Sequence, residues 1–323
     1  MQVSKPDIFE CFKFKHGPKR SSRACSGEPM LTDDYANVNG VRLHYVAAGT
    51  GPLILFLHGF PEFWYAWKNQ LSEFGKDHHA VALDMRGFNL SDKPSDVAQY
   101  RLDVLVEDIR AFAAHLSPGK KFLLVGHDWG GFVAWAFAAA HPQALEKLVI
   151  INAPHPAVFA RLLTSDLAQQ KASEYMEIFR SVQAEQILSA NNFDILANKV
   201  MVFGSENGLP AEDKPEYIKA WSQPGALTGS LNYYRANRLS TSPLAGTPNA
   251  SSFAVNVPTL VIWGEKDPAM VPKNLDGLPE FVPQLTIKRI PQASHWLVHR
   301  QSAEVTAYIR EFLQTAQRAE AKA

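Results

Sequence analysis

The chain has 323 residues, 46% of them hydrophobic, so it can bury a large core as one domain or as a domain with an insertion. Lysine plus arginine and aspartate plus glutamate both number 32, and this balance argues against nucleic acid, a membrane surface or a polyanion as a partner. The two cysteines, Cys11 and Cys25, exclude a disulfide framework for the fold and favour a cytoplasmic location.

The first part of the chain differs from the rest in composition. Residues 1–31 are polar and mildly basic, and they lack the apolar segment of a secretory signal. No apolar run in the sequence is long enough to span a bilayer. We therefore expect a poorly ordered N-terminal extension over 1–31 and no membrane span.

Short apolar runs and amphipathic segments then alternate along the chain. Residues 41–46 alternate in hydrophobicity as a half-buried strand does, and residues 53–57 are a fully apolar strand. Apolar residues within 62–74 recur at three- and four-residue spacing, which predicts a helix. Further strands are predicted over 80–83, 121–125 and 147–151, and further helices over 104–116 and 131–140. This alternation is typical of a parallel sheet covered on both faces.

Residues 157–245 interrupt the alternation. Their apolar residues follow a mostly helical pattern with no clear buried strand, so we predict an inserted helical cap. The core therefore comprises 32–156 and 246–323. The strands and the final helix that resume after the cap are predicted over 259–263, 285–287 and 303–314.

A turn between a strand and a helix carries the candidate nucleophile. Its sequence, Gly-His-Asp-Trp-Gly over 126–130, has small residues two before and two after Asp128. This arrangement resembles the nucleophile elbow of the α/β-hydrolases, with Asp where Ser is usual. A Cβ at Gly126 or Gly130 is expected to collide with the neighbouring strand or helix. The alternative is an ordinary tight turn with an N-cap aspartate.

A nucleophile at the end of one strand needs a base from another and an acid that orients the base. His295 lies between the last predicted strand and the final helix, and it alone among the 11 histidines combines that position with an upstream acid. The loop after the preceding strand offers Glu265 and Asp267. His58 and His127 lie in tight turns, where a structural hydrogen bond is the expected role.

Two main-chain N–H groups are predicted to form an oxyanion hole. One belongs to Trp129, directly after the nucleophile, and the other to Phe60 in the His-Gly-Phe-Pro loop. The proline of this loop is a candidate for a cis peptide bond. The rings of Phe60, Trp64 and Trp129 would form the walls of an apolar pocket, with ordinary core packing as the alternative for Trp64.

Six segments in order resemble the epoxide hydrolases of the α/β-hydrolase fold. They are 58–62, 126–131, 152–156, 223–237, 263–267 and 294–296. The resemblance implies a mostly parallel central sheet with helices on both faces and an inserted helical cap. It also implies that Asp267 rather than Glu265 is the acid, and that two cap tyrosines hold the epoxide oxygen. Tyr234 matches the second tyrosine of the Tyr-Tyr-Arg motif, and Tyr175 is the candidate for the other; a packed aromatic is the alternative for both.

The resemblance implies an enzyme that adds water to an epoxide to give a vicinal diol, with no cofactor and no metal. A carboxylate can displace a leaving group at saturated carbon, so Asp128 would form an alkyl ester. A water activated by His295 would then hydrolyse that ester. The expected partners are a small apolar epoxide and water, and a monomer and a homodimer both stay open.

Two other functions are weighed against this one. A haloalkane dehalogenase uses a similar triad but would need a second halide donor, commonly Asn after the His-Gly pair, where this chain has Phe60. Trp221, the one tryptophan of the predicted cap, is a possible substitute donor. A non-catalytic receptor of the same fold is less favoured, because it has no reason to retain Asp128, His295 and Asp267.

Overall fold

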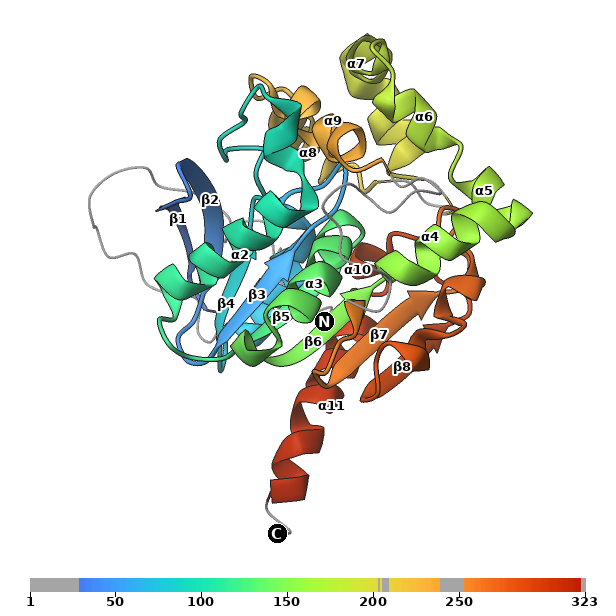
Figure 1. Ribbon diagram of the computed structural model, residues 1–323. Helices are drawn as coiled ribbons and strands as arrows, with labels where there is room; N and C mark the ends of the chain where they lie inside the picture. The colour runs from blue at the N-terminus through green and yellow to red at the C-terminus, as the bar shows by residue number, and fades with distance from the viewer. Residues whose placement is uncertain (1–28, 203, 205–208, 239–252, 321–323) are drawn as a thin grey trace, which may run out of the picture.

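The computed structural model describes residues 29–202, 204, 209–238 and 253–320. These residues form a sheet covered by helices, with a further layer of helices over one end of the sheet (Figure 1). Of the predicted extension over 1–31, only the last three residues are described, and the predicted end of the cap at residue 245 lies outside the described residues. None of the described helices combines the length and hydropathy that crossing a bilayer requires.

The described sheet has eight strands in the order β1-β2-β4-β3-β5-β6-β7-β8. The β1–β2 and β2–β4 pairs are antiparallel, and all pairs from β4 to β8 are parallel. The predicted mostly parallel sheet is therefore confirmed. The strands are β1 (Leu31–Val38), β2 (Val41–Ala48), β3 (Leu53–Leu57), β4 (His79–Leu83), β5 (Phe122–His127), β6 (Leu145–Ile151), β7 (Thr259–Gly264) and β8 (Leu285–Ile290).

β1 is the strand that the sequence pattern did not predict. It contains Asp33 and Asp34, and aspartate is disfavoured in strands. The strand nevertheless pairs along its whole length with β2, and most of its first half is exposed. Such charged side chains suit an edge strand, because they discourage pairing with another chain.

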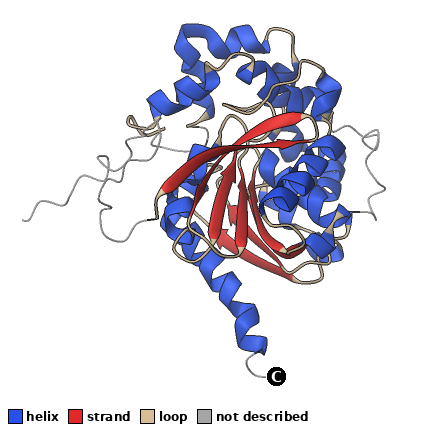
Figure 2. Ribbon diagram, turned by 90° about the vertical axis from the view of Figure 1, so that its left-hand side faces the viewer, coloured by secondary structure: helices blue, strands red, loops and turns tan. Residues whose placement is uncertain are grey.

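Helices cover both faces of the sheet (Figure 2). α2 packs beside α3 on one face, and α1 packs beside α11 on the other. The helix predicted over 62–74 starts as a 3-10 turn, Trp64–Trp67, which leads into α1. The helices of the core are α1 (Lys68–Phe74), α2 (Leu102–Leu116), α3 (Trp129–Ala140), α10 (Leu297–Arg300) and α11 (Ser302–Glu320).

The further layer, helices α4 to α9, is called the cap. It lies over the end of the sheet at which the parallel strands finish (Figure 1). Between residues 156 and 238 the described part of the chain forms no strand, as the helical pattern predicted. Loops that leave the carboxyl ends of parallel strands therefore face the cap, which is where α/β enzymes place their chemistry. The cap helices are α4 (Pro156–Ser165), α5 (Leu167–Ala172), α6 (Tyr175–Arg180), α7 (Ala184–Ile195), α8 (Lys214–Trp221) and α9 (Ala226–Ala236).

Candidate active site

Asp128 occupies the turn between β5 and α3 in a backbone conformation that L-residues rarely adopt, with φ 50° and ψ −122°. Close packing of the two flanking glycines maintains this turn. A Cβ on Gly126 would lie 2.5 Å from the carbonyl oxygen of Gly130, and a Cβ on Gly130 would lie 2.3 Å from that of Leu57. The predicted collisions are therefore present, and the turn requires glycine at both positions.

The His-Gly-Phe-Pro loop approaches Asp128 from the end of β3. The N–H of Phe60 donates a hydrogen bond of 2.8 Å to Oδ1 of Asp128. A Cβ on Gly59 would lie only 2.2 Å from the same oxygen, so only glycine allows this approach. The Phe60–Pro61 peptide bond is cis, as the sequence suggested.

The structure brings the three predicted triad residues together. Nδ1 of His295 lies 2.7 Å from Oδ2 of Asp267, and Nε2 lies 3.7 Å from Oδ2 of Asp128. All three side chains are buried. Burial alone lowers the pKa of His295, but the charge and hydrogen bond of Asp267, with the charge of Asp128, raise it to about 9. The environment of His295 therefore favours the protonated imidazole.

Asp267 is held from several directions. Its Oδ1 accepts hydrogen bonds from the N–H groups of Ala269 and Met270, at 2.8 and 3.1 Å. Its Oδ2 accepts from Nδ2 of Asn152 at 2.7 Å, in addition to His295. The other acid that the loop offered, Glu265, instead pairs with Arg289. Asp267 is thus the acid beside His295, and Asn152 is a site residue whose contact the sequence did not reveal.

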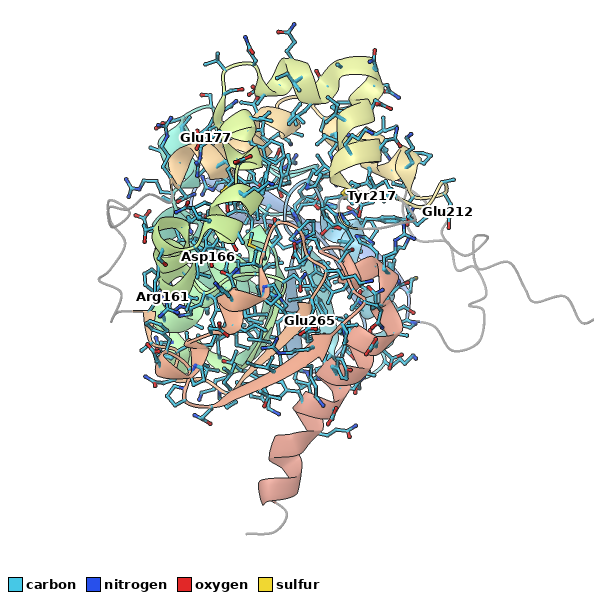
Figure 3. The ribbon with its side chains drawn as sticks, turned by 90° about the vertical axis from the view of Figure 1, so that its right-hand side faces the viewer. Arg161, Asp166, Glu177, Glu212, Tyr217 and Glu265 are labelled. Atoms are coloured by element: carbon cyan, nitrogen blue, oxygen red, sulfur yellow. The ribbon has the colours of Figure 1, made fainter. Side chains whose placement is uncertain are left out.

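A second buried network lies behind His295. Nε2 of His127 donates to the main-chain oxygen of His295 at 2.9 Å, and its Nδ1 lies 3.1 Å from Oε2 of Glu62. Oε1 of Glu62 contacts His299 and accepts from the hydroxyl of Tyr217, which lies on α8 (Figure 3). Burial alone raises the pKa of Glu62, but the two imidazoles hold it well below its usual range. His127 therefore has the structural role expected of it.

A cavity above Asp128 contains both predicted tyrosines. Tyr175 is the first residue of α6 and Tyr234 lies on α9, with ring centroids 6.3 Å apart. Burial, followed by nearby negative charge that includes Asp128, raises the pKa of both phenols well above 10. Both hydroxyl groups are therefore protonated donors at neutral pH. The cavity is lined by Asp128, Trp129, Phe132, Pro154, Phe159, Tyr175, Met176, Tyr234 and Met270.

The three aromatic residues expected at the pocket differ in position. Trp129 lines the cavity, and its ring contacts that of Tyr234 edge to face at 5.1 Å. Phe60 packs against Tyr234 at 5.4 Å without being among the lining residues. Trp64 is also absent from that lining; it is buried against Phe63 and Tyr65, as core packing would have it.

Within the described residues, no group of three or more histidine, cysteine, aspartate or glutamate side chains could hold a metal ion. The assembled groups are instead a carboxylate, an imidazole–carboxylate pair and two phenols around a mostly apolar cavity. Such a set can supply a nucleophile, a base and proton donors.

Comparisons with known proteins agree with this geometry. A family model for the alpha/beta hydrolase fold matches residues 52–300. Epoxide hydrolase 4 of Mus musculus is 38% identical over 314 residues, covering 93% of this chain and 85% of that protein. The AB hydrolase superfamily protein YfhM of Bacillus subtilis (strain 168) is 39% identical over 283 residues, covering 86% of this chain and 96% of that protein. Among solved structures, a Bacillus megaterium epoxide hydrolase in complex with an inhibitor is 40% identical with a TM-score of 0.81, covering 87% of this chain and 100% of that one. The chain therefore belongs to the α/β-hydrolase fold superfamily and, within it, to the epoxide hydrolases.

Proposed function

We propose that this enzyme converts an epoxide to a vicinal diol in two steps through an alkyl ester on Asp128. The observation that carries the proposal is the asymmetry of the Asp128 carboxylate. Oδ1 accepts the N–H of Phe60, whereas Oδ2 is 3.7 Å from Nε2 of His295, and the residue lines the cavity that holds both phenols. One oxygen is thus positioned as an acceptor while the other is available to attack.

In the first step, Oδ2 of Asp128 attacks a ring carbon of the epoxide. The ring C–O bond breaks, and the oxygen takes a proton from Tyr175 or Tyr234, leaving a phenolate. The charge of Asp128 raises the pKa of both phenols, and esterification removes that charge. Negative charge therefore moves from the carboxylate to a phenol without accumulating in the site, which favours ring opening.

In the second step, His295 removes a proton from a water that adds to the Asp128 carbonyl carbon. Oδ1 becomes the oxyanion, next to the N–H of Phe60 and that of Trp129. Trp129 begins α3, so its N–H has no acceptor within the helix. The bond between this carbon and Oδ2 then breaks, and Oδ2 leaves in the diol with the proton that His295 took from the water. The second proton of that water returns to the phenolate, which restores the phenol and the Asp128 carboxylate. Esterification also removes the Asp128 charge that helps to raise the pKa of His295, which frees the imidazole to act as a base.

The predicted domains divide these roles. The core over 32–156 and 246–323 would supply the triad and the oxyanion hole, and the cap over 157–245 would supply the phenols. The substrate is proposed to be a small apolar epoxide, because most of the lining is apolar. The scarcity of cysteine keeps the cytoplasm as the proposed location.

Dehalogenation is the less favoured chemistry. The indole of Trp221, the substitute halide donor, donates to the main-chain oxygen of Pro61 at 2.6 Å, and Trp221 is not among the residues that line the cavity. Trp129 is the one tryptophan among the residues that line the cavity. A halide would thus lack the second donor that such a mechanism needs.

Intact-protein mass spectrometry tests the proposal. After exposure to styrene oxide, His295→Gln should carry an adduct equal in mass to the whole epoxide, because ester hydrolysis lacks its base. Asp128→Ala should carry none. In a single turnover of the wild type in H₂¹⁸O, the heavy oxygen should enter Asp128 rather than the diol. Halide release from a haloalkane panel, with no diol from any epoxide, would instead favour the dehalogenase.

A further inference from the structure

We propose that Arg180 is a positioning residue for ring opening: its guanidinium joins the two tyrosine-bearing cap helices and places a positive charge beside both phenols. The inference rests on the proposed function of Tyr175 and Tyr234 as the groups that hold the epoxide oxygen. Arg180 itself is not among the residues that line the cavity, so it would act through the phenols.

Arg180 contacts the elements of both tyrosines. It is the last residue of α6, whose first residue is Tyr175. Its Nε donates to the main-chain oxygen of Tyr234 on α9 at 3.1 Å. This oxygen lies in the last turn of α9, where carbonyl oxygens lack N–H donors within the helix and a cation is favoured. A single side chain thus fixes α6 to the residue that carries the second phenol.

The rest of the guanidinium is used to hold Arg180 in place. Nη1 pairs with Glu177 at 2.7 Å, and Nη2 lies 3.9 Å from the sulfur of Met176, which lines the cavity. The Arg180 side chain is 12% exposed and that of Glu177 is 78% exposed. Glu177 lies on the outer side of the cap (Figure 3), where water screens its charge. The positive charge of the more buried Arg180 is therefore only partly offset.

This charge opposes the effect of Asp128 on the phenols. Burial and the charge of Asp128 raise the pKa of Tyr175 and Tyr234, whereas the charge of Arg180 lowers the pKa of both. Once Asp128 has become an ester, its contribution disappears and that of Arg180 persists. Arg180 would therefore stabilise the phenolate that forms when the epoxide oxygen takes its proton.

α9 also has direct anchors on the core. The hydroxyl of Tyr233 donates to the main-chain oxygen of Arg86 at 2.9 Å, and Oδ1 of Asn237 accepts the N–H of Leu102 at 2.9 Å. α6 packs against α9, so the link from Arg180 to Tyr234 connects Tyr175 to an element that the core already positions. Arg180 therefore contributes to the spacing of the two phenols.

Arg235 offers a matched control. It follows Tyr234 on α9, and its side chain is 17% exposed. It also joins cap segments, because Nη2 donates to the main-chain oxygen of Ser181 at 3.1 Å and Nη1 pairs with Glu185 at 2.7 Å. Loss of Arg235 thus measures the cost of removing a similarly buried arginine clamp from the cap.

The experiment compares Arg180→Gln, Arg180→Lys and Arg235→Gln in single-turnover measurements with styrene oxide. We expect Arg180→Gln to slow formation of the Asp128 ester by about tenfold or more and its hydrolysis by less than about twofold, because the phenols act in the first step. Arg180→Lys retains the charge and should recover part of the alkylation rate. Arg235→Gln should affect alkylation by less than about threefold.

Equal slowing of both steps in Arg180→Gln, or an alkylation loss no greater than that of Arg235→Gln, would overturn the inference. Should Arg180→Gln not fold, Arg180→Lys decides: selective slowing of alkylation by a misplaced charge supports positioning, and wild-type rates for both steps contradict it. Tyr234→Phe separates the two proposals. If that variant alkylates at the wild-type rate, the proposed role of the phenols fails, whatever the arginine variants do.

Discussion

Nδ2 of Asn152 donates a hydrogen bond of 2.7 Å to Oδ2 of Asp267, the same oxygen that lies 2.7 Å from Nδ1 of His295. Oδ1 of Asn152 in turn accepts the N–H of Gly264 at 2.7 Å. Asn152 is fully buried and its φ is 38°, a value that asparagine tolerates better than most residues. The amide therefore holds the acid that orients the proposed base.

Replacement of Asn152 by alanine should slow ester hydrolysis more than alkylation, because only hydrolysis uses His295 as a base. The loss of buried hydrogen bonds should also lower the free energy of unfolding by about 1–3 kcal/mol. Rapid-quench measurement of the two steps, together with urea unfolding, checks both effects. A selective loss of alkylation would contradict the positioning role of Asn152.

The pH dependence of the two steps should differ. His295, whose pKa is raised to about 9, must lose its proton before it can act as a base. Hydrolysis should therefore speed up as the pH rises and level off below about pH 9, because esterification removes the charge of Asp128. Alkylation needs protonated phenols and should vary little between about pH 6 and 8. Single-turnover rates across this range test the difference, and a hydrolysis rate that falls as the pH rises would argue against His295 as the base.

Gly59→Ala should slow alkylation by about a hundredfold or more. The new Cβ would lie 2.2 Å from Oδ1 of Asp128, so the carboxylate would have to leave its position beside Phe60. Misplacement of a nucleophile by about 1 Å costs on the order of a hundredfold in rate. Gly119→Ala is the control, because its φ of 71° also requires glycine while its Cβ meets no atom within 4 Å. Comparable activity of the two variants would show that the close approach at Gly59 is unimportant.

His44 should contribute to the pH dependence of stability. It is fully buried, with Nδ1 2.6 Å from Asp84 and Nε2 3.2 Å from Asp33. Burial alone lowers its pKa, but the hydrogen bond and charge of Asp84, with Asp33, raise the pKa above 6.5. Protonation of His44 thus stabilises the folded state. This contribution is complete below about pH 6.5 and is lost as the pH rises through the pKa of His44 in the folded state.

Replacement of His44 by glutamine should make the free energy of unfolding fall less steeply as the pH rises above about 6.5. His295 contributes a loss of the same sign, but it is present in both proteins and cancels in the difference. Urea unfolding at several pH values measures the two slopes. Identical slopes would show that His44 does not couple proton binding to folding.

Much of the fold could be predicted from local patterns. The apolar run over 53–57 coincides with β3, and the elbow lies where two flanking glycines and a buried strand indicated. Such features depend on residues close in sequence: an apolar run must be buried, and a tight turn must avoid a Cβ clash. By contrast, the polar segment of β1 forms a strand because it pairs with β2. The local sequence pattern does not indicate this pairing.

The sequence by itself determined all the strands but β1 and the loops that follow them. It also determined Asp128, His295 and the pair Glu265 and Asp267 as candidate site residues. Only the tertiary structure decided that Asn152 supports Asp267, that Trp64 packs away from the cavity lining, and that Arg180 reaches Tyr234. The physical reason is that hydrophobic periodicity and turn chemistry act over a few residues. Contacts between side chains on different elements depend instead on how the whole cap and sheet pack together. A hydrogen bond forms only within a narrow range of distances, so small differences in this packing decide which contacts exist.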